Sequence, residues 1–476
     1  MAFLKDNSRL ILVTLLVLVA SSVVLLNEQN SMIVVANYCL LGAILLPLFL
    51  KQVDTAIWLI IGLAPISLGA TLPFLSLRMS IPTELLTGCL LFIFGIKMLV
   101  GLRFDKRILK HPISVILLLD ISWSAISAFQ SELSEVALKR LLMKTLFIAV
   151  YFFIFANQLD SAKKQKRLFL LYAIGAIYPI YHAISVHAHR GFGHNTAFDI
   201  SAPFYSDHTV YGACLAFVFP FLIIYSIELS KNKSAYQLGG WLLTVLFGAG
   251  IVFSYSRASW ISLIIAGGFV LLTRLRVRML HILLGLVITV TLVVVNFETI
   301  YASMRDNETK YGDDIATHLS SVSNLQSDQS NLERVNRWVC AYRMFEDEPI
   351  TGFGPGTYQF IYDRYQTPEF MTRISTHRGD RGNAHSEYLS ALSETGIVGF
   401  LLFLLLLFYV LHLGLKLLYA PLARTERLVV LSALLGLITF YTHGLFNTFS
   451  DIEKMGVLLY GSIAILVVHD LKLVQK

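Results

Sequence analysis

The stretch that decides the fold is "YLSALSETGIVGFLLFLLLLFYVLHLGL", residues 388–415. It opens with polar residues, among them Glu394, and then runs apolar for some twenty residues. A helix needs about 20 mainly apolar residues to cross a bilayer. The stretch therefore predicts a membrane helix whose mouth carries polar groups, directly after His385 in "RGNAHSE" (381–387).

Similar apolar runs recur along the whole chain of 476 residues, which is 56% apolar and only 14% charged. Soluble proteins carry roughly a quarter charged residues. The sequence therefore predicts an all-α polytopic membrane protein with about 12–14 transmembrane helices and a large periplasmic loop containing short helices. The predicted spans are 10–26, 32–50, 56–72, 84–101, 112–129, 140–158, 168–186, 209–229, 238–254, 259–274, 279–296, 388–415, 428–446 and 453–471.

The charged residues predict the orientation of these spans. Lys and Arg crowd the connections near 103–110, 163–167, 274–278 and 416–427. If all four connections are cytoplasmic, successive spans alternate in direction without conflict, and both termini lie in the cytoplasm. The predicted parts are a bundle of about eleven helices (1–296), a periplasmic loop (297–387) and about three further helices (388–476). The net charge of +7 then reflects loop charges, and no nucleic-acid partner is expected.

The long loop is too long to be structureless in a compact protein, which suggests function. Within it, "SNLERVNRWVCAYRMFEDEP" (330–349) predicts a helix with a capping box of Ser330 and Glu333, ending before Pro349. The loop holds eight arginines and one lysine. Arginine binds phosphate or carboxylate through two parallel hydrogen bonds, although most of these arginines are expected to pair with the loop's fourteen Asp and Glu residues.

Two arginines are candidates for anion binding. Arg257 lies in "SYSRASW" (254–260), a tight turn at the outer mouth of two spans, where a charge faces water, headgroups or an anionic ligand. An interfacial anchor beside Trp260 is the alternative. Arg334 lies one helical turn before Trp338, and a plain surface arginine is the alternative there.

The loop "TGFGPGTY" (351–358) is a candidate for contact with an anion through Gly354, Gly356 and Tyr358. A dinucleotide fingerprint is rejected, because that motif requires a strand before the glycines and a helix after them. A simple turn that returns the chain to the membrane is an equally good interpretation.

His385 is a candidate general base where outside water meets the membrane, with an ordinary interfacial residue as the alternative. Trp338 and Glu394 are further candidates for binding the substrate. Glu394 lies more than two turns into the following helix, where an acid is costly unless paired. Asp120 is expected to form a structural pair with Lys144. No metal or cofactor is expected: Asp313 and Asp314 are adjacent, but no histidine accompanies them at ligand spacing.

Over roughly residues 180–470 the chain resembles the superfamily of O-antigen ligases and polymerases, which also includes pilin oligosaccharyltransferases. The similar motifs, in the family's order, are "SDHTVYGACLAF" (206–217), "SYSRASW", "ERVNRWVCAYRMFEDEPITGFGPGTY", "NAHSEYLSALSETGIVG" and "HGLFNTFSDIEK" (443–454).

The resemblance implies metal-independent transfer of a glycan from undecaprenyl pyrophosphate to a hydroxyl, on the periplasmic face of the bacterial inner membrane. It implies that Arg257 and Arg334 hold the pyrophosphate and that His385 acts as base. Many members have asparagine after the histidine. Here it is Ser386, which leaves a helper hydrogen bond in question.

Three functions stay open from the sequence. The favoured one is ligation of O-antigen to lipid A–core, and a polymerase that extends a glycan acceptor would use the same groups. A transporter or lipid-linked glycan flippase belongs to another class. It predicts several charged residues near the bilayer midplane, where Asp120 is almost alone.

Overall fold

The computed structural model describes residues 53–72, 77–193, 196–232, 235–275, 329–372 and 382–474, with residue 375 and isolated positions between 277 and 299. The predicted spans 10–26 and 32–50, most of 279–296, and most of the predicted loop before residue 329 lie outside the described residues. The described chain is helical apart from one two-stranded sheet, so the predicted all-α class is confirmed.

The first part of the described chain runs from the start of the helical bundle to the predicted long loop. Its elements are α3 (Val53–Leu63), η1 (Ala64–Ile66), β1 (Leu68–Leu72), β2 (Leu77–Ile81), α4 (Thr83–Leu99), α5 (Lys106–Lys110), α6 (Pro112–Gln130), α7 (Ser134–Phe147), the π-helix η2 (Ile148–Ile154), α8 (Phe155–Gln158), α9 (Ala162–His189), α10 (His208–Lys231), α11 (Gln237–Phe253) and α12 (Arg257–Arg274).

The second part begins in the long loop and ends with three long helices. Its elements are α16 (Gln329–Asp347), α17 (Tyr358–Ile361), η4 (Tyr362–Tyr365), α18 (Glu387–Tyr419), α19 (Arg424–His443) and α20 (Glu453–Leu473). Short helices inside the loop were predicted, and α16, α17 and η4 confirm them.

Seven helices of the described chain are long and apolar enough to cross a membrane: α6, α9, α10, α12, α18, α19 and α20. The apolar segments 53–66 and 237–253 are shorter. The chain is therefore a multi-pass membrane protein, while the number of twelve to fourteen spans stays a prediction.

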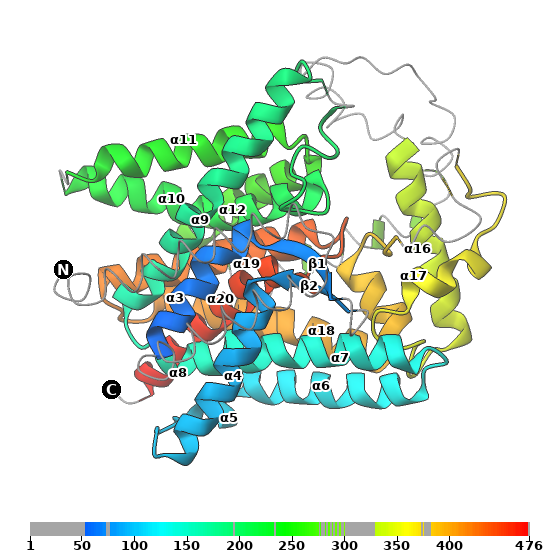
Figure 1. Ribbon diagram of the computed structural model, residues 1–476, viewed down its shortest axis with the longest axis horizontal. Helices are drawn as coiled ribbons and strands as arrows, with labels where there is room; N and C mark the ends of the chain where they lie inside the picture. The colour runs from blue at the N-terminus through cyan, green and yellow to red at the C-terminus, as the bar shows by residue number, and fades with distance from the viewer. Residues whose placement is uncertain are drawn as a thin grey trace.

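The helices differ in how far they are enclosed by their neighbours. The apolar window of α20 is 83% buried, against 33% for α18 and 39% for α6. A helix that is apolar all round and enclosed by others lies at the centre of a bundle, and half-exposed apolar helices face lipid. α16 and α17 lie at one end of the bundle and the end of α20 at the other (Figure 1).

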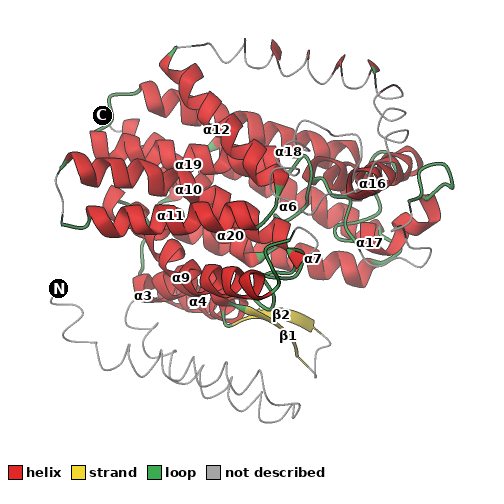
Figure 2. Cartoon of the chain, turned by 90° about the horizontal axis from the view of Figure 1, so that it is seen from above, coloured by secondary structure: helices red, strands yellow, loops and turns green. Residues whose placement is uncertain are grey.

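The predicted span 56–72 is wrong as drawn. The helix α3 stops at Leu63, and Pro65 lies in the first turn of the short helix η1. Proline has no N–H to continue the hydrogen-bond ladder and favours the start of a helix over its interior. Strands β1 and β2 then form an antiparallel hairpin, with Leu68 opposite Ile81, at the edge of the molecule (Figure 2).

The predicted span 388–415 is present within α18, but the helix is interrupted at Gly396, which has φ of 64° and ψ of −168°. A Cβ added there would lie 2.1 Å from the carbonyl oxygen of Ile350. Only glycine fits both the backbone angles and this approach. The apolar run that crosses the membrane therefore starts at residue 397, and residues 387–395 form a separate short helix at the mouth of the bundle.

The backbone groups freed by this interruption find partners on neighbouring segments. The N–H of Ile397 donates to the carbonyl of Pro349 at 2.9 Å. The indole Nε1 of Trp123 on α6 donates to the carbonyl of Thr395 at 2.8 Å. A break in a membrane helix is tolerated where other groups satisfy the backbone, so the segment 349–354 and α6 hold the mouth of α18 in place.

Candidate active site

The turn that carries Arg257 is fixed by close packing against α10. Tyr255 adopts φ of 50°, and the Ser256 hydroxyl caps α12 by accepting from the N–H of Ser259. A Cβ on Gly212 of α10 would lie 2.7 Å from Oγ of Ser259, so only glycine allows the turn to approach this closely. Arg257 is consequently placed at the first position of α12, at the mouth of two membrane helices.

Helix α16 presents Arg334 and Trp338, four residues apart, on one face. The indole Nε1 of Trp338 donates to the backbone carbonyl of His385 at 3.3 Å, and the ring packs against Phe446 at 6.5 Å between centroids. Trp338 therefore holds the backbone that carries the histidine, as a positioning residue, and it does not touch the imidazole through this bond.

Arg337, which the sequence analysis did not single out, fixes the segment before the histidine. Arg337 is 3% exposed, and its Nε donates to Glu333 at 3.0 Å while Nη1 donates to the carbonyl of Asn383 at 3.3 Å. The side chain also lies over the Tyr362 ring at 4.8 Å. A Cβ on Gly382 would meet the guanidinium at 2.0 Å. The signal was present in the sequence, since Glu333 and Arg337 are one helical turn apart.

His385 is held in an uncommon backbone conformation, with φ of 50°. The side-chain oxygen of Asn383 accepts from the His385 N–H at 2.9 Å, which stabilises the turn. Ser386 then caps α18 by accepting from the N–H of Leu389. Non-glycine residues with positive φ cluster at functional sites, where the surroundings impose them.

The side chain of Ser386 is thus used as a helix cap, but Asn447 of the α19–α20 connection hydrogen-bonds the imidazole of His385. This bond favours the charged form of the ring, so the Asn447 oxygen is the acceptor. Among the described residues, the buried Nδ1 of His385 has no hydrogen-bond partner. An asparagine therefore assists the histidine from a position distant in sequence.

Positive charge from helix α16 acts on this histidine, through Arg334 and Arg337. The charge of Arg257 acts on Arg334, and that of Arg334 acts on His385. Burial, and then Arg257, lowers the pKa of Arg334 to about 10, although Asp207 opposes this. Burial, followed by Arg334 and Arg337, lowers the pKa of His385 to about 3. At neutral pH the imidazole is therefore uncharged and able to accept a proton.

Asp207, His208 and His443 complete the surroundings. Asp207 caps α10, and His208 Nδ1 lies 2.7 Å from the carbonyl of Ser254. His443, at the end of α19, is affected by the charge of Arg334, and its buried Nε2 has no partner among the described residues. These residues lie inside motifs noted in the sequence, but nothing in the sequence alone marked them individually.

The structure links Arg257 to Arg334, Arg334 to His385, and Trp338 to the backbone of His385, but it places the other predicted site residues elsewhere. Glu394 accepts from the N–H of Gly356 at 2.8 Å and from that of Tyr358 at 3.2 Å. The Gly354 N–H donates to the Glu394 carbonyl at 2.8 Å. The glycine loop therefore binds an anion of the chain itself, which favours a structural role over contact with substrate.

This loop also explains how an acid is accommodated at the depth of Glu394. The carboxylate lies just before the interruption at Gly396, with two backbone donors and the charge of Arg140 acting on it. The expected pair of Asp120 and Lys144 is confirmed, at 2.7 Å.

Comparison with known proteins gives one family. Residues 242–404 match the sequence model described as O-antigen ligase, and this range contains Arg257, Arg334, His385 and the whole of the glycine loop. A search of curated proteins finds no match. Residues 242–404 thus confirm the resemblance of the sequence motifs to the O-antigen ligase superfamily, a family of membrane glycosyltransferase-type enzymes.

Proposed function

We propose that the chain transfers a glycan from undecaprenyl pyrophosphate to a hydroxyl of lipid A–core, on the periplasmic face of the bacterial inner membrane. The observation that carries this proposal is the convergence of Arg257, Arg334 and His385, which lie far apart in sequence, at one mouth of a multi-pass bundle. The family match supports the class of reaction. The lipid tail of the donor would lie in the surrounding membrane lipid.

The two arginines account for binding and departure of the donor. The charge of Arg257 disfavours the cationic form of Arg334, and an anion bound near both guanidinium groups would offset that repulsion. When the bond from the sugar to the diphosphate breaks, negative charge grows on the diphosphate. Fixed cations then stabilise the transition state more than the ground state.

His385 accounts for activation of the acceptor. In the proposed reaction the acceptor oxygen forms a bond to the anomeric carbon, the bond from that carbon to the diphosphate breaks, and the hydroxyl proton passes to the imidazole. With Asn447 accepting from one N–H of the imidazole, the other ring nitrogen is left to act as the base. General base catalysis of this kind contributes roughly 10²–10⁴-fold.

The test is His385→Ala in the full-length chain, with His412→Ala as the matched control, because His412 is exposed on α18. We expect His385→Ala to abolish surface glycan while membrane levels of the protein stay unchanged. Normal surface glycan in that variant contradicts the role of base.

A polymerase would use the same groups, and the acceptor separates the two activities. Deletion of the gene followed by a glycan gel distinguishes them. Accumulated lipid-linked polymer indicates a ligase, whereas single capped repeats indicate a polymerase.

A further inference from the structure

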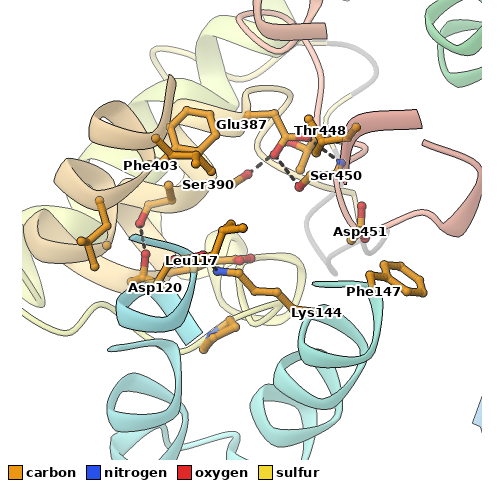
Figure 3. A pocket seen from close by; sticks show the side chains of 18 of the residues that line it. Leu117, Asp120, Lys144, Phe147, Glu387, Ser390, Phe403, Thr448, Ser450 and Asp451 are labelled. Atoms are coloured by element: carbon orange, nitrogen blue, oxygen red, sulfur yellow. Dashed lines mark hydrogen bonds and ion pairs between the residues drawn. The ribbon is translucent and has the colours of Figure 1, made fainter. Parts of the chain in front are cut away.

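A pocket with both apolar and polar lining residues lies behind the first turns of α18, between α6, α7, α19 and α20 (Figure 3). Its cavity volume is about 140 Å³. Glu387, Ser390 and Ser450 lie along one side, and Asp120 and Lys144 lie across from them. The described lining does not include Arg257, Arg334 or His385, so this pocket is separate from the candidate diphosphate site.

The ionisable groups of this pocket include more acids than bases. They are Asp120, Arg140, Lys144, Glu387, Glu394 and Asp451. Both cations are already paired, Lys144 with Asp120 at 2.7 Å and Arg140 with Asp451. Four carboxylates against two cations make the pocket unsuitable for diphosphate, which needs unsatisfied positive charge.

The remaining lining suits a ring with hydroxyl groups. Phe403, Tyr441 and Tyr460 line the pocket together with aliphatic side chains such as Leu117 and Leu402. Sites for small molecules combine such apolar and aromatic walls with a few polar contacts. An apolar cavity of about 150 Å³ holds benzene, a bare six-membered ring. The buried carboxyl and hydroxyl groups of this pocket need water or a polar ligand as partners.

Two short segments, 383–387 and 447–450, carry residues of both the pocket and the candidate active site. His385 interacts with Asn447 on one side of them. Two residues on, Glu387 lines the pocket and accepts from the N–H groups of Phe449 and Ser450, both at 2.7 Å. Thr448 also lines the pocket, and its carbonyl accepts from Asn383 at 3.4 Å. A ligand in the pocket therefore lies directly behind the histidine.

We propose that this pocket binds an uncharged sugar ring of the acceptor, and that it positions the acceptor opposite to the diphosphate. This inference rests on the proposed function, because it names the acceptor of that reaction. The cationic site around Arg257 and Arg334 attracts the anionic donor, whereas the acidic pocket repels it. Donor and acceptor therefore bind on opposite sides of the segment that carries His385.

Binding is tested without any need for activity. Ser390→Cys is placed in the full-length chain after Cys39, Cys89, Cys214 and Cys340 are replaced by alanine, and labelling by a water-soluble thiol reagent is timed. A probe at about ten times its dissociation constant leaves about one site in eleven free. We expect methyl glucoside or methyl galactoside to slow labelling about tenfold, with no effect from inorganic pyrophosphate or octanol.

The proposal is overturned if neither glycoside protects the Ser390→Cys thiol from labelling. It is also overturned if pyrophosphate protects the thiol equally well, if octanol protects it, or if the reagent never labels it. None of these outcomes depends on catalysis, so failure of the pocket and failure of the proposed reaction are distinguishable.

A kinetic test assigns the ring to acceptor or donor. Ala391 lines the pocket without a polar contact, so Ala391→Phe fills it. Leu405→Phe adds the same bulk to α18 on an outward face, because Leu405 is 49% exposed. We expect Ala391→Phe to raise the acceptor KM about tenfold or more, with the donor KM unchanged and Leu405→Phe unaffected. A raised donor KM with an unchanged acceptor KM overturns the assignment to the acceptor.

Discussion

The carboxylate of Glu394 offers a direct test of why the glycine loop folds as it does, through the substitution Glu394→Gln. Its two oxygens accept from different N–H groups, those of Gly356 and Tyr358. Both oxygens accept only in the ionised form. Glutamine keeps the shape but supplies one oxygen and one NH₂ group, so one backbone N–H faces another donor.

The magnitude follows from these two bonds. A hydrogen bond to a charged group contributes about 1.5–3 kcal/mol, against about 0.5–1.5 kcal/mol for a neutral one, so the retained bond weakens by about 1 kcal/mol. The other N–H is left unsatisfied in a partly buried site, which costs about 1–3 kcal/mol. We expect Glu394→Gln to lower the free energy of unfolding by about 2–4 kcal/mol.

The assay is SDS titration of the purified chain in mixed micelles, followed by donor KM measured where both proteins are folded. Glu346→Gln is the control, because Glu346 is exposed on α16 and such surface changes stay within about 0.5 kcal/mol. Equal stability of the two variants, with a raised donor KM for Glu394→Gln, would refute the reasoning. The loop N–H groups would then face the substrate.

Three further predictions concern the site itself. The pKa of His385 is lowered to about 3, so the imidazole stays deprotonated in weak acid. We therefore expect kcat/KM to stay level from about pH 8 to about pH 5. A fall in kcat/KM centred near pH 6.5 would contradict this. Trp338→Phe keeps an aromatic ring and removes one hydrogen bond worth about 1 kcal/mol. We expect kcat to fall about fivefold with the donor KM unchanged. A raised donor KM would indicate that Trp338 contacts the donor directly. Arg257→Lys keeps the charge and loses the planar guanidinium that forms two parallel hydrogen bonds. We expect kcat/KM to fall at least about tenfold relative to the control Arg274→Lys, at the other end of α12. Full activity of Arg257→Lys would indicate that Arg257 is an interfacial anchor.

Much of the fold could be predicted because a membrane helix is recognisable from its own stretch of sequence. The predicted spans 112–129, 168–186, 209–229 and 453–471 agree closely with α6, α9, α10 and α20. Each is a long apolar run, and length and composition alone determine whether it can cross a bilayer. The segment 56–72 was mispredicted because apolar residues continue past Pro65 into a hairpin, and composition does not distinguish the two.

The candidate site could be predicted only in part, for a related reason. The motifs pointed to Arg257, Arg334 and His385, but Gly356 and Tyr358 were assigned to an external anion. No local pattern showed that Glu394, some forty residues later, would occupy their N–H groups. Arg337 and Asn447 were missed because their roles depend on contacts with the chain around His385.

The sequence by itself determined the membrane class, most helix positions in the described chain, and the chemical types of the candidate groups, since apolar length and side-chain chemistry are local properties. Only the tertiary structure decided which polar groups meet: it paired Glu394 with the glycine loop, set Asn447 against His385, and interrupted α18 at Gly396. Those outcomes depend on contacts between residues distant in the chain, where burial makes each polar group find whichever partner the packing brings near.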